Sequence, residues 1–206
     1  MSFSHYKSIS TVAKAFQIKY NLSNFISELE FPVAPAFQEE LDLLFTDGVV
    51  DNSEDAICET LIYPVLKEVW KPYRKQLTLW SHQSLIYDEN LSGQPDYMVT
   101  KRSPLGPIVF DKPYFLVVEA KQDKFEEGWG QCLAELIAVQ KINDDLEQKI
   151  IGIVSNGKVW QFGQLQGDVF TRNKTFYTIQ DLESLFASVN YAFHQCQLQV
   201  IPMDNE

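Results

Sequence analysis

The segment that most constrains the fold is 113–121, Pro-Tyr-Phe-Leu-Val-Val-Glu-Ala-Lys. Five large apolar residues, most of them aromatic or β-branched, stand between a proline and two charges. This pattern is typical of a short central strand buried on both faces. Because side chains two apart on a strand point the same way, Phe115, Val117, Glu119 and Lys121 are expected on one face. Charged side chains on a packed face need partners, so the sequence must supply partners for Glu119 and Lys121.

The elements around this strand predict an α/β protein with a mixed central sheet flanked by helices. The other expected strands cover 77–87, 93–101, 149–154, 159–165 and 169–178. The expected helices cover 8–20, 36–45, 52–70, 125–142 and 181–196. Pro64 is expected to kink the third helix. Asn156-Gly157 predicts a type I′ hairpin turn with φ > 0 at both central residues.

With 206 residues the chain is expected to form one globular unit. Residues 1–49 are predicted to be a helical extension packed on the core, and 50–206 to be the functional domain. No apolar run approaches the ~20 residues that cross a bilayer, and the N-terminus lacks a signal-peptide pattern. Three widely spaced cysteines indicate reduced thiols in a cytoplasmic protein.

The net charge of −11 argues against a strong, non-specific grip on nucleic acid, because phosphate binding needs Lys and Arg. It leaves room for a local basic surface or a metal that meets the phosphate. The expected sources of a basic surface are Lys71, Arg74, Lys75, Lys101, Arg102, Arg172 and Lys174. The three histidines, His5, His82 and His194, have no ligand spacing, so neither a zinc site nor a histidine nucleophile is predicted.

Glu54 lies at the centre of the apolar stripe of the 52–70 helix when residues are placed at 100° intervals. Glu59 lies at the edge of the same stripe. An acid at a helix start that points toward the core is either a capping charge or a site residue. Glu54 is therefore a candidate site residue, with Glu59 in reserve.

Asp96 provides the second acid, on the strand that precedes 113–121. Two carboxylates from adjacent strands, Asp96 and Glu119, with a nearby backbone carbonyl such as that of Ala120, form a hard oxygen site suited to Mg²⁺ or Mn²⁺. Lys121 could orient a bound water or stabilise developing charge. Glu54 could complete the metal shell, and Gln131, on the following helix with Glu135 one turn on, could hydrogen-bond near it.

The motif Pro95-Asp96, followed by Glu119-Ala120-Lys121, resembles the PD-(D/E)XK nuclease superfamily, which has the restriction-endonuclease-like fold. The resemblance extends over roughly residues 50–165. Within the superfamily, this part of the chain is similar to restriction-subunit-like members. The resemblance implies a restriction-endonuclease-like core in which Asp96 and Glu119 bind Mg²⁺, Lys121 is the catalytic lysine, and Glu54 and Gln131 complete the site.

The activity that this resemblance implies is Mg²⁺-dependent hydrolysis of nucleic-acid phosphodiesters. The expected enzyme is an endonuclease whose substrate is DNA in preference to RNA. A homodimer or a partner protein would then help to choose the target. Two alternatives stay open. One is a binding module that keeps the fold without turnover, which the acidic charge favours. The other is a metal-dependent hydrolase of small phosphoesters or nucleotides, which a closed pocket of nucleotide size would favour.

Overall fold

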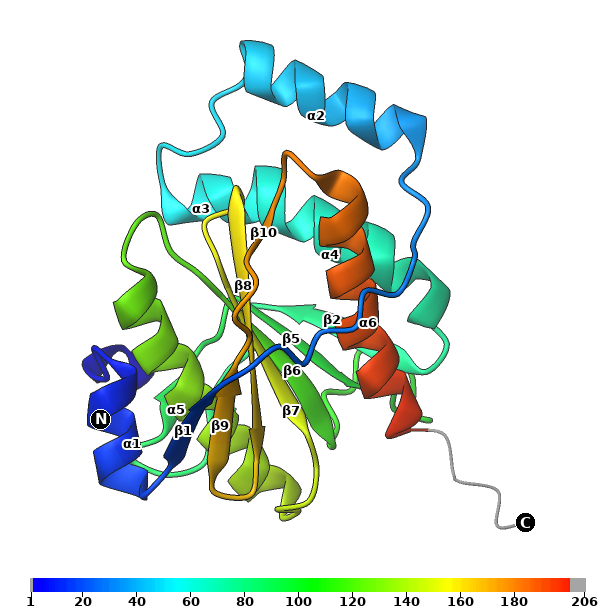
Figure 1. Cartoon of the computed structure of the whole chain (residues 1–206). Coiled ribbons are helices and arrows are strands. Elements are labelled where there is room, and N and C mark those ends of the chain that lie inside the picture. The colour runs from blue at the N-terminus through cyan, green and yellow to red at the C-terminus, as the bar shows by residue number, and fades with distance from the viewer. Residues whose placement is uncertain (1, 201–206) are drawn as a thin grey trace.

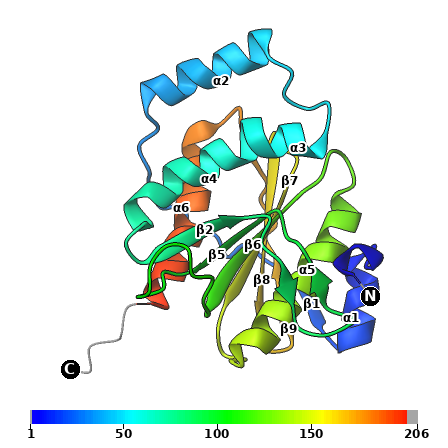
Figure 2. The ribbon, with the colours of Figure 1, turned by 180° about the vertical axis from the view of Figure 1, so that it is seen from behind.

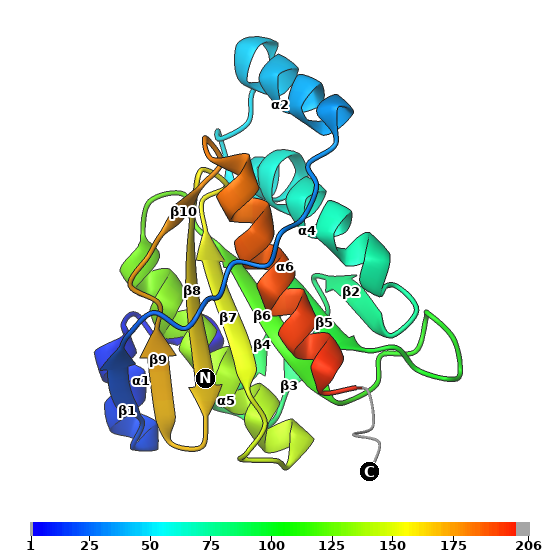
Figure 3. The ribbon, with the colours of Figure 1, turned by 45° about the vertical axis from the view of Figure 1, so that its right-hand side comes forward.

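Strand β6, Tyr114–Ala120, is buried at every residue and lies inside an eight-stranded sheet, as the sequence predicted. The computed structural model describes residues 2–200. Seven strands follow the order β1-β9-β8-β7-β6-β5-β2, and β10 pairs with β8. Figure 3 shows the strands in this order, with α6 lying across them. The pairs β6–β7 and β1–β9 are parallel and the other pairs are antiparallel, so the sheet is mixed.

The remaining strands of the sheet are β1 Lys19–Leu22, β2 Leu77–Ser81, β5 Tyr97–Lys101, β7 Ile150–Ser155, β8 Val159–Gln166, β9 Val169–Arg172 and β10 Tyr177–Thr178. A separate two-stranded sheet pairs β3 Leu85–Ile86 with β4 Ser92–Gly93. The predicted strand 77–87 is therefore two strands, β2 and β3. The predicted strand 169–178 is likewise divided between β9 and β10.

Helices cover both faces of the sheet, giving three layers (Figures 1 and 2). The helices and short helical turns are η1 Phe3–His5, α1 Ile9–Phe16, α2 Pro35–Asp47, α3 Glu54–Ile57, η2 Cys58–Ile62, α4 Tyr63–Trp70, η3 Lys71–Tyr73, α5 Phe125–Asn143 and α6 Leu182–Leu198. One apolar core lies between the sheet and α3, α4 and α6. The second lies between the sheet and α5, α1 and η1. Within residues 2–200 no helix is both long and apolar enough to cross a membrane.

The helical segment from α3 to α4 is irregular at η2, which is a π-helical turn that immediately precedes Tyr63-Pro64. A π turn places one extra residue in the helix, and such turns are frequent at functional sites. The apolar stripe that the sequence predicted is buried, and its members include Ile57, Leu61 and Val65.

Two predictions about local backbone are wrong. Phe115 and Val117 were expected on one face of the sheet, but they pack in the two different cores on its opposite faces. The cause is a β-bulge in β6: Val99 pairs with Leu116 and Thr100 pairs with Tyr114, so one extra residue of β6 lies between these pairs. The β7–β8 hairpin forms, but only Gly157 has a positive φ, so the turn is not type I′. Asn156 instead accepts backbone hydrogen bonds from the two residues that follow Gly157, through its side-chain oxygen.

The N-terminal extension was predicted to be helical, but it also contributes β1. This strand pairs in parallel with β9 and extends the sheet at one edge. The prediction missed it because all four of its residues are exposed, so its sequence carries no alternating apolar pattern.

Gly130 of α5 allows the N-terminal segment to pack closely on that helix. A Cβ added at Gly130 would lie 2.4 Å from the nitrogen of Ser8 and 2.5 Å from the oxygen of Tyr6, and both are backbone atoms. Gly130→Ala is expected to lower the free energy of unfolding by about 1–3 kcal/mol, since the two backbones must separate. Chemical denaturation measures the change, with the exposed Glu126→Ala variant of the same helix as a control within ±0.5 kcal/mol. Equal stability of Gly130→Ala and wild type would contradict this close packing.

Candidate active site

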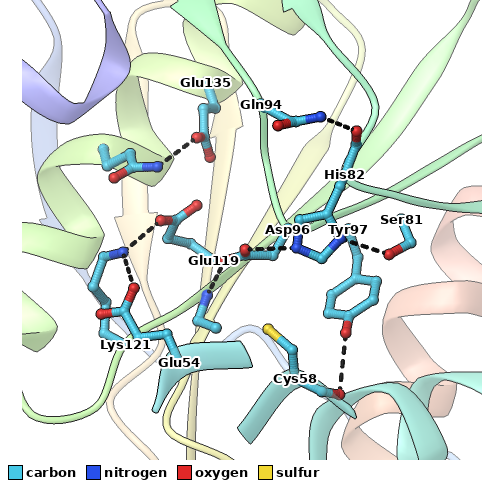
Figure 4. Close-up of polar contacts among 12 residues, drawn as sticks. Glu54, Cys58, Ser81, His82, Gln94, Asp96, Tyr97, Glu119, Lys121 and Glu135 are labelled. Atoms are coloured by element: carbon cyan, nitrogen blue, oxygen red, sulfur yellow. Dashed lines mark hydrogen bonds and ion pairs between the residues drawn. The ribbon is translucent and has the colours of Figure 1, made fainter. Parts of the chain in front are cut away.

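Asp96 and Ala120 meet where β5 begins and β6 ends. Asp96 immediately precedes β5, and Tyr97 pairs with Val118 in the antiparallel β5–β6 ladder. This register puts the carboxylate of Asp96 beside the end of β6, where its Oδ2 accepts a hydrogen bond of 2.7 Å from the backbone nitrogen of Ala120 (Figure 4). The predicted adjacency of the two strands thus brings Asp96 next to the Glu-Ala-Lys segment.

Glu119 and Lys121 form an ion pair at this end of the sheet, with 2.8 Å between Oε1 and Nζ. The Glu119 side chain is 2% exposed and the Lys121 side chain is 15% exposed, so water screens their attraction only weakly. Burial lowers the pKa of the Lys121 ammonium, but the attraction of Glu119 and Glu54 outweighs burial and raises it. Lys121 therefore stays charged at neutral pH.

Glu54, at the first residue of α3, also reaches Lys121, with 3.3 Å between Oε2 and Nζ. Its side chain is half exposed, so it lies at the rim of the site and does not point into the core. Ser53 caps α3 by accepting a hydrogen bond from the backbone nitrogen of Ala56, and this fixes where the helix begins. Glu59 is exposed and takes no part in these contacts, so the structure brings Glu54 to the site and not Glu59.

Gln131 lies on α5 one turn before Glu135 and contacts it directly. Its Nε2 donates to Glu135 Oε1 over 3.2 Å. Glu135 is fully buried, although no role was predicted for it. Their spacing of four residues on one helix face was the available signal. The burial that makes Glu135 important comes from packing against the sheet, which that spacing does not reveal.

Two buried carboxylate oxygens, Glu119 Oε2 and Glu135 Oε2, have no hydrogen-bond partner among residues 2–200. Burial, with Glu135 and Asp96 as further causes, raises the pKa of Glu119 well above its ordinary value. Burial is also the main cause that raises the pKa of Glu135 to about 8, with Asp96 adding to it. Asp96 shares the trend, since burial outweighs its hydrogen bond from Ala120 and raises its pKa. The cluster thus holds more carboxylates than Lys121 alone can balance, and a bound cation would relieve this excess.

His82 lies next to Asp96, although the spacing of the histidines indicated no ligand or catalytic role. His82 Nε2 is 3.5 Å from Asp96 Oδ1. The signal was present in the strand order: His82 follows β2, Asp96 precedes β5, and Ser81 pairs with Tyr97 between them. One strand was expected from 77 to 87, so the break after β2, where His82 lies, was not predicted.

A pocket of about 410 Å³ opens beside Lys121. It is bounded by the N-terminal segment on one side and the start of α5 on the other. Its lining residues are Ser4, Tyr6, Lys7, Glu54, Lys121, Gln122, Asp123, Lys124, Glu127 and Gln131. The N-terminal segment therefore forms a wall next to the site, where the sequence predicted only packing.

Most of the predicted basic surface lies elsewhere. Arg74 and Lys75 precede β2 and Arg102 follows β5, whereas Asp96 lies at the other end of this five-residue antiparallel pair. At about 3.4 Å per residue, roughly 15 Å separates the two ends. The lysines near the pocket, Lys7 and Lys124, both pair with Glu127.

No protein-family model matches this sequence, and no curated protein matches it.

Glu135→Gln is expected to stabilise the metal-free protein at pH 8. Because the pKa of Glu135 rises from 4.5 to about 8, the folded state holds a proton that the unfolded chain has lost. The stability of wild type therefore falls as the pH rises from 4.5 to 8. The variant removes this dependence and should gain about 1–3 kcal/mol at pH 8 and little near pH 4.5. Urea unfolding in EDTA measures the difference, and a gain that is equal at both pH values would contradict the argument.

Proposed function

We propose that this protein is a metal-dependent nuclease with a restriction-endonuclease-like core, which hydrolyses phosphodiester bonds in DNA in preference to RNA. The observation that carries the proposal is Glu119, a buried acid beside Asp96, with Oε1 on Lys121 and Oε2 without a hydrogen-bond partner in the described part of the chain. The order of elements supports the fold assignment: a long helical segment is followed by the antiparallel strands β2, β5 and β6, then by α5 and the parallel strand β7.

Asp96, Glu119 and the carbonyl of Ala120 are the residues that would hold Mg²⁺ or Mn²⁺, with Glu54 at the rim. Their donors are oxygens, which suit a hard cation, and Glu119 Oε2 accepts no hydrogen bond from residues 2–200. When bound, such a metal polarises a phosphoryl oxygen and lowers the pKa of a water ligand.

Lys121 supplies the positive charge that the chain itself brings to the reaction. Its ammonium is held by Glu119 and Glu54, which fixes its position and keeps it protonated. A fixed ammonium can orient the attacking water or stabilise the charge that develops on the phosphoryl oxygens. Gln131 acts one step further away, by holding the carboxylate of Glu135 behind Glu119.

The pocket favours a second candidate, a hydrolase of small phosphoesters or nucleotides. Its volume of about 410 Å³ lies within the range of small-ligand sites, and Lys121 is part of its wall. The net charge of −11 also disfavours extended contact with a duplex.

One assay distinguishes these functions. Purified protein is incubated with circular plasmid, single-stranded DNA and a small phosphodiester, in Mg²⁺, in Mn²⁺ and in EDTA. The nuclease proposal predicts metal-dependent cleavage of DNA. Hydrolysis of the small ester alone would support the second candidate. Binding of DNA without cleavage, by protein that is folded and binds Mn²⁺, would support the non-catalytic binding module and overturn both.

A further inference from the structure

A second group of ligand atoms lies on the other side of Asp96. Cys58, His82 and Asp96 each offer one donor atom, and these three atoms lie within 4.8 Å of one another. The two oxygens of Asp96 are divided between the two sides: Oδ2 accepts from Ala120, whereas Oδ1 faces His82 at 3.5 Å (Figure 4). Unlike the cluster around Glu119, this group contains sulfur and nitrogen donors.

The backbone holds His82 in an unusual conformation. Its φ is 51°, in the left-handed region that costs a residue with a side chain roughly 1 kcal/mol or more. The N–H of His82 donates to the carbonyl of Asp96 over 2.9 Å, and the side-chain amide of Gln94 donates to the carbonyl of His82. Such strain persists only where the surroundings enforce it, and here it directs the imidazole to Asp96.

Neighbouring side chains fix the imidazole ring as well. His82 Nδ1 is 2.8 Å from Ser81 Oγ, and the ring meets Tyr97 edge to face with 5.9 Å between centroids. A hydrogen bond at one ring nitrogen leaves the other free to bind a metal, and this is how metal-binding histidines are usually oriented. Nε2 is the nitrogen on the side of Asp96.

Cys58 is the first residue of the π-helical turn η2. Its backbone carbonyl accepts a hydrogen bond of 3.1 Å from the Tyr97 hydroxyl, so the ring that packs on His82 also anchors the turn that carries Cys58. The thiol is buried, and burial together with Asp96 raises its pKa to about 12. A metal that binds here must therefore displace the thiol proton.

We propose that Cys58, His82 and Asp96 bind a transition-metal ion, with Zn²⁺ as the best fit, at a position distinct from the hard oxygen site. Thiolate and imidazole ligands favour Zn²⁺ and Co²⁺ over Mg²⁺. Tetrahedral zinc places its ligands roughly 3.3–3.8 Å apart, given bond lengths of about 2.0–2.3 Å. The Asp96–His82 pair is already within this range, and because all three donor atoms lie within 4.8 Å of one another, closing the rest requires a shift of at most about 1 Å.

Asp96 would be a ligand in both metal sites, so occupation of the site at Cys58 and His82 should affect the proposed function. An ion bound by Cys58, His82 and Asp96 Oδ1 competes with the oxygen site for the negative charge of the same carboxylate. Zn²⁺ is therefore expected to inhibit Mg²⁺-dependent cleavage. Only this consequence rests on the proposed function; metal binding itself can be measured without turnover.

Titration with Co²⁺, followed by absorption spectroscopy, tests the site directly. Co²⁺ takes the place of Zn²⁺, and a thiolate ligand gives a charge-transfer band in the near ultraviolet. Wild type should show this band, and Cys58→Ser should abolish it. His82→Gln should weaken Co²⁺ affinity at least 10-fold. Cys196→Ala, which removes a buried thiol of the core between the sheet and α6, should keep the band.

Two results would overturn the inference: no charge-transfer band in folded wild type, or a band that persists unchanged in both Cys58→Ser and His82→Gln. His82→Gln guards against a folding artefact, because the His82 side chain is 45% exposed and glutamine can occupy its place. If the band forms as expected but no substrate is cleaved, the metal site stands and the nuclease proposal fails.

Discussion

Lys121→Ala is expected to lower the rate of Mg²⁺-dependent DNA cleavage by about 10²–10³-fold, which is typical for loss of a group that stabilises transition-state charge. Lys121 is the ammonium that lies between Glu119 and Glu54, and its position is fixed by contacts of 2.8 and 3.3 Å. Alanine removes the charge without adding bulk. Initial rates on supercoiled plasmid at saturating Mg²⁺ measure the effect.

Lys158→Ala is the matched control for this variant. Lys158 also pairs with an acid close to the start of α3, Asp51, at 2.6 Å, but it belongs to the β7–β8 hairpin and lies outside the cluster. Its rate should stay within a few-fold of wild type. Cleavage by Lys121→Ala at the wild-type rate, with a contaminant excluded, would remove Lys121 from the reaction.

Asp96→Asn is expected to have opposite effects on metal binding and on stability. Asparagine keeps an oxygen that can accept the hydrogen bond from Ala120, but it loses the charge that a cation needs. Mn²⁺ affinity should fall by more than about 100-fold, since even partners outside the ligand shell are worth about 10–100-fold. Cleavage should be lost with it. Because burial raises the pKa of Asp96, the neutral side chain should leave the metal-free protein at least as stable as wild type at pH 7.

Titration calorimetry with Mn²⁺ and urea unfolding in EDTA measure the two effects in one preparation. Asp168→Asn serves as the control, because Asp168 is an exposed acid that pairs with Lys19 at the sheet edge. Loss of stability without loss of Mn²⁺ binding in Asp96→Asn would indicate a structural role for this carboxylate and contradict its assignment as a ligand. A residue that weakens the free protein but is needed for its ligand is the expected mark of a functional site.

The sequence predicted the parts of the fold that local patterns determine. β6 was recognisable because a run buried on both faces is apolar throughout, and the 52–70 helix because its stripe repeats every 3.6 residues. β1 was not, because its pairing with β9 joins residues about 150 positions apart and leaves its side chains exposed. The extra residue at Phe115 was equally hidden, since the register of two strands is a tertiary property.

The candidate site divides in the same way. Period two along the strands and the order of elements sufficed to bring together Asp96, Glu119 and Lys121. The helix stripe indicated Glu54 but directed it toward the core, whereas its side chain is half exposed and reaches Lys121 from the rim. Glu135 and His82 were not predicted as site residues, because their positions near Asp96 and Glu119 depend on which elements pack together. The charge on Glu135 is costly only because α5 lies on the sheet, and His82 reaches Asp96 only because β2 pairs with β5.

The decisive experiment is cleavage of supercoiled plasmid in Mn²⁺ by wild type, Lys121→Ala and Asp96→Asn, assayed side by side. We expect wild type to cleave, EDTA to stop the cleavage, and both variants to lose it while remaining folded. Cleavage that both folded variants retain at the wild-type rate would contradict the proposed function, because the reaction would then take place without the Asp96–Glu119–Lys121 cluster.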